Sequence, residues 1–359
     1  MIYKVIGLMS GSSLDGLDII YTTISDARDN WEFEIEHSAC ITFPEALRIS
    51  LQKASSLPVS DFLQLHTSFG RYLGEQVNAF IEKNQLQHKV HFIVSHGHTA
   101  YHNPSANTSF QLGDGASITA ITNLTTISDL RNMDVALNGQ GAPIVPIADK
   151  YLFKNYDFCL NLGGIMNITI KKDNEILAFD IGGCNQILNH FAEKKHLKFD
   201  DRGQLATSGK FHKAIFDALN EVEYFQKPAP KSLSNDFTPN NLLTKLEDLN
   251  IEDALYTACK HIAYQIKQAI TPYTKASSTK ILVTGGGAHN HFLITSTNEM
   301  LVDTNVTLEI PNDIIVDNKE ALAMAFFGIL RWREQTNTIK SVTGATQDSI
   351  GGAIWIPNN

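Results

Sequence analysis

The sequence is poor in cysteine and in positive charge. Its four cysteines, Cys40, Cys159, Cys184 and Cys259, lie far apart and form no C-x-x-C pair, which argues against a disulfide framework and against a zinc site. The 29 basic residues are outnumbered by 38 acidic ones, and the formal net charge is -9. A nucleic-acid partner is therefore disfavoured, because binding a phosphate backbone requires a basic surface.

Long apolar runs and export signals are also lacking. No stretch approaches the roughly 20 apolar residues that span a bilayer, and the first residues have neither the basic segment nor the apolar core of a signal peptide. We therefore expect a cytoplasmic protein without a membrane partner.

Two common nucleotide-binding motifs are missing as well. The segment from Gly11 to Gly16 is not followed by Lys-Ser/Thr, which disfavours a P-loop. No G-x-G-x-x-G opens a helix after the first strand, which disfavours a Rossmann site. The length of 359 residues and the hydrophobic fraction of 43% predict a globular protein of about two domains.

What the sequence does contain is a set of glycine turns between apolar strands. Residues 5–9 and 19–24 read as strands that flank the turn Ser10 to Asp18. Backbone N–H groups and hydroxyls in such a turn suit a polyphosphate, and Asp15 and Asp18 could hold Mg²⁺. The alternative is an ordinary hairpin turn with solvated aspartates.

Two later segments favour the first interpretation. Residues 158–170 repeat the scheme of strand, glycine turn and strand, and residues 280–290 form a strand that ends in three glycines. Glycine allows the backbone to approach a flat or charged ligand closely. Together the segments suggest a nucleotide held between two similar lobes.

Hydrophobic periodicity places further elements and indicates α/β layers. Strands are predicted at 31–36, 90–94, 125–128 and 176–180, and a strand followed by a turn at 109–115. Helices are predicted at 44–51, 60–84, 116–122, 186–195, 252–269 and 318–333. The polar segment 129–143 is predicted to be a functional loop or hinge, and residues 226–240 an irregular surface segment. The apolar residues 354–356 are expected to pack back on the first lobe.

Several motifs carry a family resemblance that covers nearly the whole chain in order. They are residues 7–18, Ser95-His96-Gly97-His98-Thr99, residues 129–134, residues 139–146, residues 161–169, residues 284–290 and residues 319–323. The chain resembles anhydro-N-acetylmuramic acid kinases, a bacterial branch of the superfamily of actin, hexokinases and heat-shock chaperone ATPases. The resemblance implies two RNase H-like (actin-like ATPase) lobes with ATP and sugar in the cleft between them. We expect an N-terminal lobe at 1–136 plus about 345–359 and a C-terminal lobe at 137–344.

The activity that the resemblance implies has two linked events. Water opens the 1,6-anhydro ring of anhydro-N-acetylmuramic acid, and the freed O6 takes the γ-phosphate of ATP. The product is N-acetylmuramate 6-phosphate, a step in recycling cell-wall sugar. ATP and Mg²⁺ are the implied cofactors, a small anionic amino sugar is the implied partner, and the family suggests a homodimer.

Asp180 is the candidate catalytic residue. Ring opening needs a base that activates water beside a carbon of oxocarbenium character, and a carboxylate suits this task. Asp180 closes the strand at 176–179 and matches the catalytic Asp of the family; the alternative is an N-cap of the following helix or a turn Asp. The family usually continues Thr-Gly-Pro and then Asn, whereas this chain has Ile181-Gly182-Gly183-Cys184-Asn185.

The remaining candidate residues divide between nucleotide and sugar. For the phosphates the resemblance implies Ser10, Gly11, Ser12 and Ser13, with Asp15 near Mg²⁺, and Gly163 and Gly164 from the other lobe. Gly285, Gly286 and Gly287 would lie against the adenosine.

Three residues are candidates for sugar binding. Arg131 could pair with the lactyl carboxylate of a muramic acid, or could form a surface ion pair with Asp129 or Asp134. His96 could hydrogen-bond the sugar or be a satisfied core histidine. Glu320 could serve the dipole of a helix that it begins, whereas the family suggests contact with the sugar.

The chain also departs from the family at several positions. His98 stands where Gln is common, Ser12 replaces Thr, and residues 231–237 lack the family's Arg. These departures keep two other functions open. One is a kinase for another sugar without ring opening, and the other is a catalytically silent nucleotide or sugar sensor.

Overall fold

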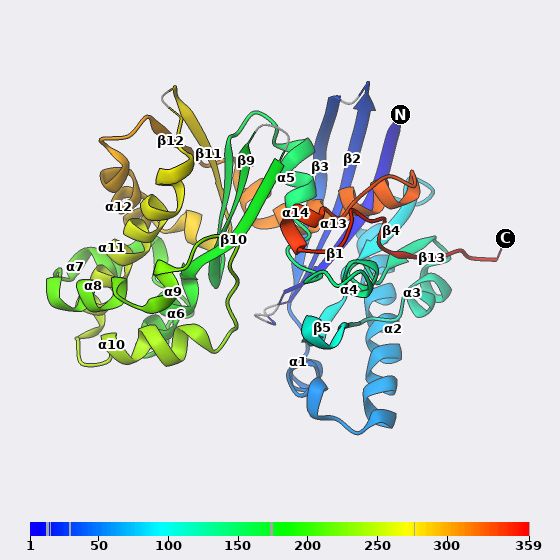
Figure 1. Ribbon diagram of the computed structural model, residues 1–359. Helices are drawn as coiled ribbons and strands as arrows, with labels where there is room; N and C mark the ends of the chain where they lie inside the picture. The colour runs from blue at the N-terminus through cyan, green and yellow to red at the C-terminus, as the bar shows by residue number, and fades with distance from the viewer. Residues whose placement is uncertain (12–13, 15, 29, 173–174, 276, 359) are drawn as a thin grey trace. The chain divides into compact units, whose positions relative to one another are not determined.

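The computed structural model describes residues 1–11, 14, 16–28, 30–172, 175–275 and 277–358. The chain forms two compact units (Figure 1). Unit 1 comprises Met1–Leu152 and Asn318–Asn359, and unit 2 comprises Phe153–Asp317. The contacts thus place the divisions after Leu152 and after Asp317, whereas the sequence led us to expect them after residue 136 and near residue 345.

Unit 1 is built on a six-stranded sheet with the order β13-β7-β4-β1-β2-β3. β1 pairs antiparallel with β2 and parallel with β4, β2 pairs antiparallel with β3, and β4 pairs parallel with β7. A separate two-stranded sheet contains β5 and β6. The strands are β1 (Ile2–Ser10), β2 (Leu17–Ala27), β3 (Asn30–Ile41), β4 (Phe92–Ser95), β5 (His98–Asn103), β6 (Thr108–Leu112), β7 (Thr126–Ser128) and β13 (Ala353–Trp355).

The helices of unit 1 follow the strands in the chain. They are α1 (Glu45–Gln52), α2 (Val59–Lys83), α3 (Gly115–Thr122), α4 (Asn132–Ala136), α5 (Pro146–Leu152) and α14 (Lys340–Thr343), together with most of α13 (Asp313–Trp332).

Unit 2 is built on a five-stranded sheet with the order β10-β9-β8-β11-β12. Its strands are β8 (Phe158–Leu162), β9 (Ile165–Lys172), β10 (Glu175–Gly183), β11 (Thr279–Thr284) and β12 (Val306–Glu309). Its helices are α6 (Asn185–Glu193), α7 (Gln204–Ser208), α8 (Lys213–Asn220), α9 (Glu223–Gln226), α10 (Thr244–Leu246), α11 (Ile251–Ile270) and α12 (His291–Leu301).

Both units share one sheet topology. When the strands of each of the two larger sheets are numbered in chain order, leaving out β5 and β6, both sheets have the core order 3-2-1-4-5. In both, strand 1 is antiparallel to strand 2 and parallel to strand 4. This is the arrangement of an RNase H-like lobe, so the prediction of an α/β fold with two such lobes is confirmed. The glycine turns β1–β2 and β8–β9 therefore occupy equivalent positions in the two units.

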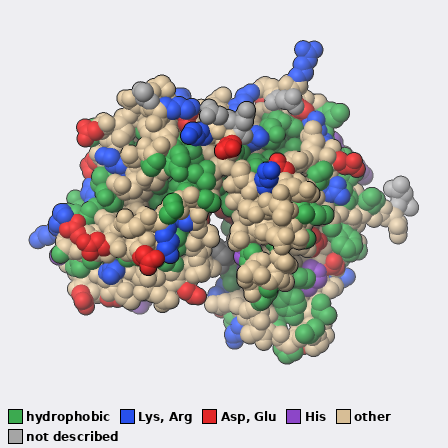
Figure 2. Space-filling view, viewed as in Figure 1, with side chains coloured by type: hydrophobic (Ala, Val, Ile, Leu, Met, Phe, Trp, Pro, Cys, Tyr) green, Lys and Arg blue, Asp and Glu red, His purple; other side chains and the backbone are tan. Residues whose placement is uncertain are grey.

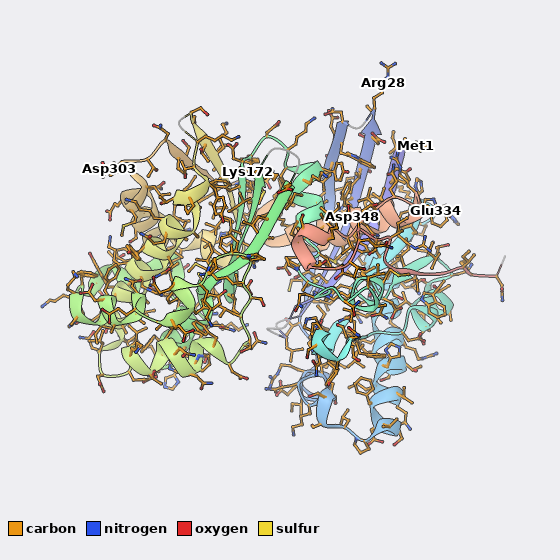
Figure 3. All side chains as sticks on the ribbon, in the orientation of Figure 1. Met1, Arg28, Lys172, Asp303, Glu334 and Asp348 are labelled. Carbon is orange, nitrogen blue, oxygen red and sulfur yellow. The ribbon has the colours of Figure 1, made fainter. Side chains whose placement is uncertain are left out.

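The next hairpin of each sheet, β2–β3 in unit 1 and β9–β10 in unit 2, is also equivalent. Arg28 follows the end of β2 and Lys172 ends β9, and Figure 3 labels both residues. On the face of the molecule seen in Figure 2, acidic and basic side chains are interspersed.

Close packing joins helix α13 to the sheet of unit 1. A Cβ on Gly7 of β1 would lie 2.3 Å from the carbonyl oxygen of Ala321, and one on Gly328 would lie 2.1 Å from a methyl of Val94. Both distances are far below van der Waals contact, so the helix can lie this close only because these residues are glycine. The contact fixes the position of the residues that precede Ala321 on α13.

The spacing of apolar residues in α2 explains why this segment forms a helix. Its apolar residues recur every three or four positions and form one buried face. That face packs in the core of unit 1 and consists of Leu65, Phe69, Leu73, Val77 and Phe80. In unit 2, helix α11 buries the equivalent stripe Ala254, Leu255, Ala258, Ile262 and Ile266.

Three further segments can be compared with the elements predicted from the sequence. The apolar tail packs back on unit 1 as expected, because β13 pairs antiparallel with β7. The predicted loop 129–143 instead contains the short helix α4. Helix α13 begins at Asp313, five residues before the expected start at 318.

Candidate active site

The turn between β1 and β2 is described only in part. Ser10 ends β1 and is buried, and Gly11 follows it. Ser12, Ser13 and Asp15 lie outside the described residues, so their assigned roles stay predictions.

The Ser10 hydroxyl has a histidine neighbour. Its Oγ lies 3.4 Å from Nδ1 of His98, the first residue of β5. His98 is buried, and this burial lowers the pKa of its ring to about 4. The ring is therefore neutral near pH 7 and can orient the hydroxyl. The sequence marked His98 only as a departure from the family and not as a site residue.

His96 and Arg131 form a joined pair in unit 1. Nε of Arg131 donates to Nε2 of His96 at 2.9 Å, and Nη1 of Arg131 donates to the carbonyl oxygen of Gly141 at 2.9 Å. An arginine N–H can only donate, so Nε2 of His96 is the acceptor. The proton of the neutral ring is then on Nδ1, which donates to the Gly97 carbonyl oxygen at 2.9 Å.

The pKa values of His96 and Arg131 agree with a neutral His96 ring beside a charged guanidinium. Burial, reinforced by the Arg131 charge, lowers the pKa of His96 to about 3, so the ring stays neutral. Burial also lowers the pKa of Arg131 to about 10, against the opposing charges of Glu320 and Asp134. The guanidinium therefore remains charged near pH 7, with its plane fixed by two partners.

Asp134 does not form the ion pair that was the alternative role of Arg131. Its Oδ2 accepts from the Gly141 N–H at 2.7 Å and its Oδ1 accepts from the Thr343 hydroxyl at 2.7 Å. The side chain is buried. Asp134 thus holds the segment that carries Gly141, whose carbonyl in turn holds Arg131.

Glu320 lies in the third turn of α13, because the helix begins at Asp313. The alternative of a first-turn dipole role is therefore wrong. Burial raises the pKa of Glu320, and the charge of Asp18 raises it further, while Lys319 and Arg131 oppose the rise. Glu320, Asp18 and Arg131 are thus electrostatic neighbours within unit 1.

In unit 2 the β8–β9 turn caps helix α6. The carbonyl oxygen of Gly163 accepts from the Asn185 N–H at 3.0 Å, and that of Gly164 accepts from the Gln186 N–H at 3.1 Å. The Asn185 side chain donates to the Leu162 carbonyl oxygen at 2.9 Å. The turn is therefore held rigidly against the start of the helix.

The triple glycine lies beside this turn. A Cβ on Gly285 would lie 2.4 Å from Oδ1 of Asn161, and one on Gly287 would lie 2.7 Å from Leu162 Cβ. Gly285 also has a φ of 83°. Gly286 between them is exposed. Gly285 and Gly287 thus allow the turn to pack on β8, and Gly286 presents its backbone to solvent.

Asp180 is held by a loop that follows it far along the chain. Its Oδ2 accepts from the Leu233 N–H at 2.9 Å, and its backbone carbonyl accepts from the Tyr224 hydroxyl at 2.7 Å. The N-cap of α6 is Cys184, so Asp180 is not the cap of that helix. Burial raises the pKa of Asp180, against the lowering effect of the Leu233 N–H.

Comparison with known protein families assigns the chain to one of them. A family model described as anhydro-N-acetylmuramic acid kinase matches residues 3–357. The chain belongs to the anhydro-N-acetylmuramic acid kinase family. The predicted family resemblance is therefore confirmed, and the chain is an enzyme of the kinase class that uses ATP.

Two named relatives match this chain along nearly its whole length. A protein of Haemophilus influenzae named anhydro-N-acetylmuramic acid kinase is 31% identical over 375 residues, covering 98% of this chain and 97% of the relative. A protein of the same name from Hydrogenovibrio crunogenus is 32% identical over 372 residues, covering 98% of each. A solved structure, component A of the (R)-2-hydroxyglutaryl-CoA dehydratase of Acidaminococcus fermentans, gives a TM-score of 0.49 at 12% identity, over 90% of this chain and 97% of that chain.

The turn in which this chain departs from its family is tightly packed. A Cβ on Gly182 would lie 3.0 Å from the ring of Phe225, and one on Gly183 would lie 2.4 Å from Oγ1 of Thr238. In this chain Thr238 fills the space that a side chain at 183 would need.

Metal binding and membrane insertion can be judged for the described part of the chain. Within it, no group of three or more His, Cys, Asp or Glu side chains is arranged to hold a metal ion by itself. Within the same residues, no helix is both long and apolar enough to cross a membrane.

Sequence reasoning missed Tyr224 and Leu233. The Leu233 group that contacts Asp180 is a backbone N–H, and the residue type carries no signal of it. Tyr224 was not singled out because nothing in its local pattern differs from that of a core tyrosine.

Proposed function

We propose that this kinase opens 1,6-anhydro-N-acetylmuramic acid with water and phosphorylates O6 to give N-acetylmuramate 6-phosphate. The observation that carries the proposal is the environment of the Asp180 carboxylate, in a chain that belongs to this family. One carboxylate oxygen is fixed by the Leu233 N–H, and burial raises the pKa of the group. A carboxylate with a raised pKa is a stronger base once ionised, as general-base catalysis requires.

In this proposal the Asp180 carboxylate takes a proton from the attacking water. The water oxygen bonds to the anomeric carbon while the bond from that carbon to the bridging oxygen breaks. The freed O6 then bonds to the γ-phosphorus of ATP, and ADP leaves. The proton on Asp180 passes to solvent after the product departs, so that one proton is released in each turnover.

Arg131 is proposed to bind the lactyl carboxylate. Its Nε and Nη1 are engaged by His96 and Gly141, and its Nη2 has no hydrogen-bond partner among the described residues. A fixed guanidinium with a free N–H can orient a carboxylate. Because His96 uses both ring nitrogens within the protein, we propose that it positions Arg131, and that Glu320 contacts the sugar from the same group of charges.

The glycine turns are proposed to bind the nucleotide. Ser10 and Gly11, with Ser12 and Ser13, would donate to the phosphates in unit 1, and Gly163, Gly164 and the exposed Gly286 would contribute backbone groups in unit 2. Asp15 and Asp18 are carboxylates of the type that holds Mg²⁺ in phosphate sites. Bound Mg²⁺ supplies charge neutralisation at the transferred phosphoryl group.

The test mixes protein, ATP, Mg²⁺ and the anhydro sugar, and follows ADP by a coupled assay and the sugar product by mass spectrometry. The proposal expects equal amounts of ADP and N-acetylmuramate phosphate. ADP formation with ordinary hexosamines only would show a kinase without ring opening. Binding of both ligands with no ADP would show a silent sensor.

A further inference from the structure

Three atoms of Asp180 are held by one segment, residues 224–233, which begins in helix α9 and is called the loop 224–233 below. The Tyr224 hydroxyl donates to the Asp180 carbonyl oxygen at 2.7 Å, the Asp180 N–H donates to the Lys231 carbonyl oxygen at 3.0 Å, and the Leu233 N–H donates to Oδ2 at 2.9 Å. β10 is an edge strand of the unit 2 sheet, so its outer backbone groups are available to the loop. The loop thus acts as a short additional partner of the strand where the candidate base lies.

The two ends of the loop are tied to each other beside Asp180. Nζ of Lys231 donates to the Tyr224 carbonyl oxygen at 3.1 Å and lies 4.6 Å from the centre of the Tyr224 ring. Such a cation–π contact adds to the hydrogen bond. The Tyr224 ring is buried and also packs on Phe225 and Phe237. The loop is therefore braced, although the sequence predicted only an irregular surface segment.

The two carboxylate oxygens of Asp180 differ in their hydrogen-bond partners. Oδ2 accepts from Leu233, whereas Oδ1 has no hydrogen-bond partner among the described residues. Two titratable groups of the loop lie near Asp180: the Tyr224 hydroxyl, bonded to its backbone carbonyl, and the Lys231 ammonium, which is turned toward the Tyr224 ring. A β-bulge between Asp180 and Gly182 shifts the pairing with β9 at the same place.

We propose that the loop 224–233 positions the base, with the Leu233 N–H fixing Oδ2 so that Oδ1 receives the proton of the attacking water. This inference rests on the proposed function, in which Asp180 is that base. Tyr224 and Leu233 are positioning residues, because they touch Asp180 and not the substrate. Phe225 and Thr238, from the same part of the chain, pack against Gly182 and Gly183 in the turn that follows Asp180.

The first experiment compares Leu233→Pro with Leu233→Ala. Both remove the leucine side chain, but only proline removes the N–H that holds Oδ2. That N–H lowers the pKa of Asp180, so its loss raises the pKa. In Leu233→Pro we expect the acidic limb of the profile of kcat/KM for the sugar against pH to move up by about one pH unit, since a hydrogen bond to a charged group is worth about that much. Leu233→Ala should keep the wild-type limb.

The second experiment keeps the inference testable if Leu233→Pro does not fold. Tyr224→Phe removes the hydroxyl but keeps the ring under Lys231. We expect kcat to fall by about fivefold to tenfold, with unchanged affinity for ATP, because one buried hydrogen bond to the base strand is lost. Tyr256→Phe on α11, whose ring packs on Phe292, is the matched control and should keep wild-type kcat.

The outcomes distinguish a failure of the proposed function from a failure of the positioning role of the loop 224–233. A wild-type chain that makes no ADP with the anhydro sugar overturns the proposed function and this inference with it. An active wild type whose two Leu233 variants share one pH profile, or whose Tyr224→Phe variant keeps full kcat, overturns the inference alone. The expected shift and loss in an active enzyme support both.

Discussion

Acidification should destabilise unit 1 through two buried histidines. The side chains of His96 and His98 are 3% and 5% exposed, and burial lowers their pKa values from 6.5 to about 3 and about 4. Between about pH 4 and 6.5 the unfolded chain therefore binds a proton at each histidine and the folded unit does not. Stability rises with pH in this window and is lost as the pH falls from about 6.5.

The size of the effect follows from the pKa difference. From pH 7 to pH 5 each unfolded histidine gains about 2 kcal/mol from protonation that the folded ring cannot match, and the two together give about 4 kcal/mol. Glu320 has the opposite effect on stability. Burial raises its pKa, so the folded unit binds a proton more tightly than the unfolded chain, and acidification stabilises unit 1 through this group. Carboxylates with lowered pKa values, such as Glu45, act only at lower pH. A loss of this size is a large fraction of the stability of a typical domain.

Tryptophan fluorescence can report unit 1 by itself, since Trp31, Trp332 and Trp355 all lie in it. Urea unfolding at pH 7, 6 and 5 should show a steady fall in the free energy of unfolding. His98→Gln should reduce the fall between pH 7 and pH 5 by about 2 kcal/mol. His88→Asn, which replaces an exposed histidine of left-handed φ by a residue that tolerates it, should leave the fall unchanged. A free energy of unfolding that stays constant between pH 7 and pH 5 would refute the reasoning.

Two further variants test the site residues. His96→Ala removes the acceptor of Arg131 Nε, so the guanidinium loses its fixed orientation; we expect KM for the sugar to rise about tenfold or more, with KM for ATP unchanged, in steady-state kinetics. Equal changes in both KM values would contradict a role specific to Arg131. Gly183→Ala places a Cβ 2.4 Å from Oγ1 of Thr238, and we expect overpacking to cost about 1–3 kcal/mol in urea unfolding followed by circular dichroism. Adding Thr238→Ala should recover most of that loss, and a double variant no more stable than Gly183→Ala would show that Thr238 is not the obstacle.

The sequence predicts the sheets of both units well because each hairpin is specified locally. Apolar strands flank glycine turns at 10–18 and at 163–164, and the structure has hairpins at both places. The equivalence of the two units was visible in this repeated pattern. The apolar residues of β13 also have a local signal, which explains why the tail was predicted to pack on the first lobe.

Long-range contacts account for what the sequence did not predict. Helix α4 forms in the predicted loop 129–143 where Asp134 binds Thr343, a residue 209 positions away. His98 meets Ser10 across 88 positions. Leu233 contacts Asp180 with a backbone N–H, 53 positions away. None of these contacts leaves a periodic signal, and the last does not depend on the residue type.

The central claim is that the Asp180 carboxylate activates the water that opens the ring. Asp180→Asn keeps the size of the side chain and an oxygen that can accept from Leu233, but it cannot take the proton. The decisive measurement is turnover of this variant with ATP and the anhydro sugar, with ATP affinity measured alongside by calorimetry. The account predicts that turnover falls by at least about 10²-fold while ATP affinity stays near that of the wild type. Turnover at the wild-type rate would contradict it.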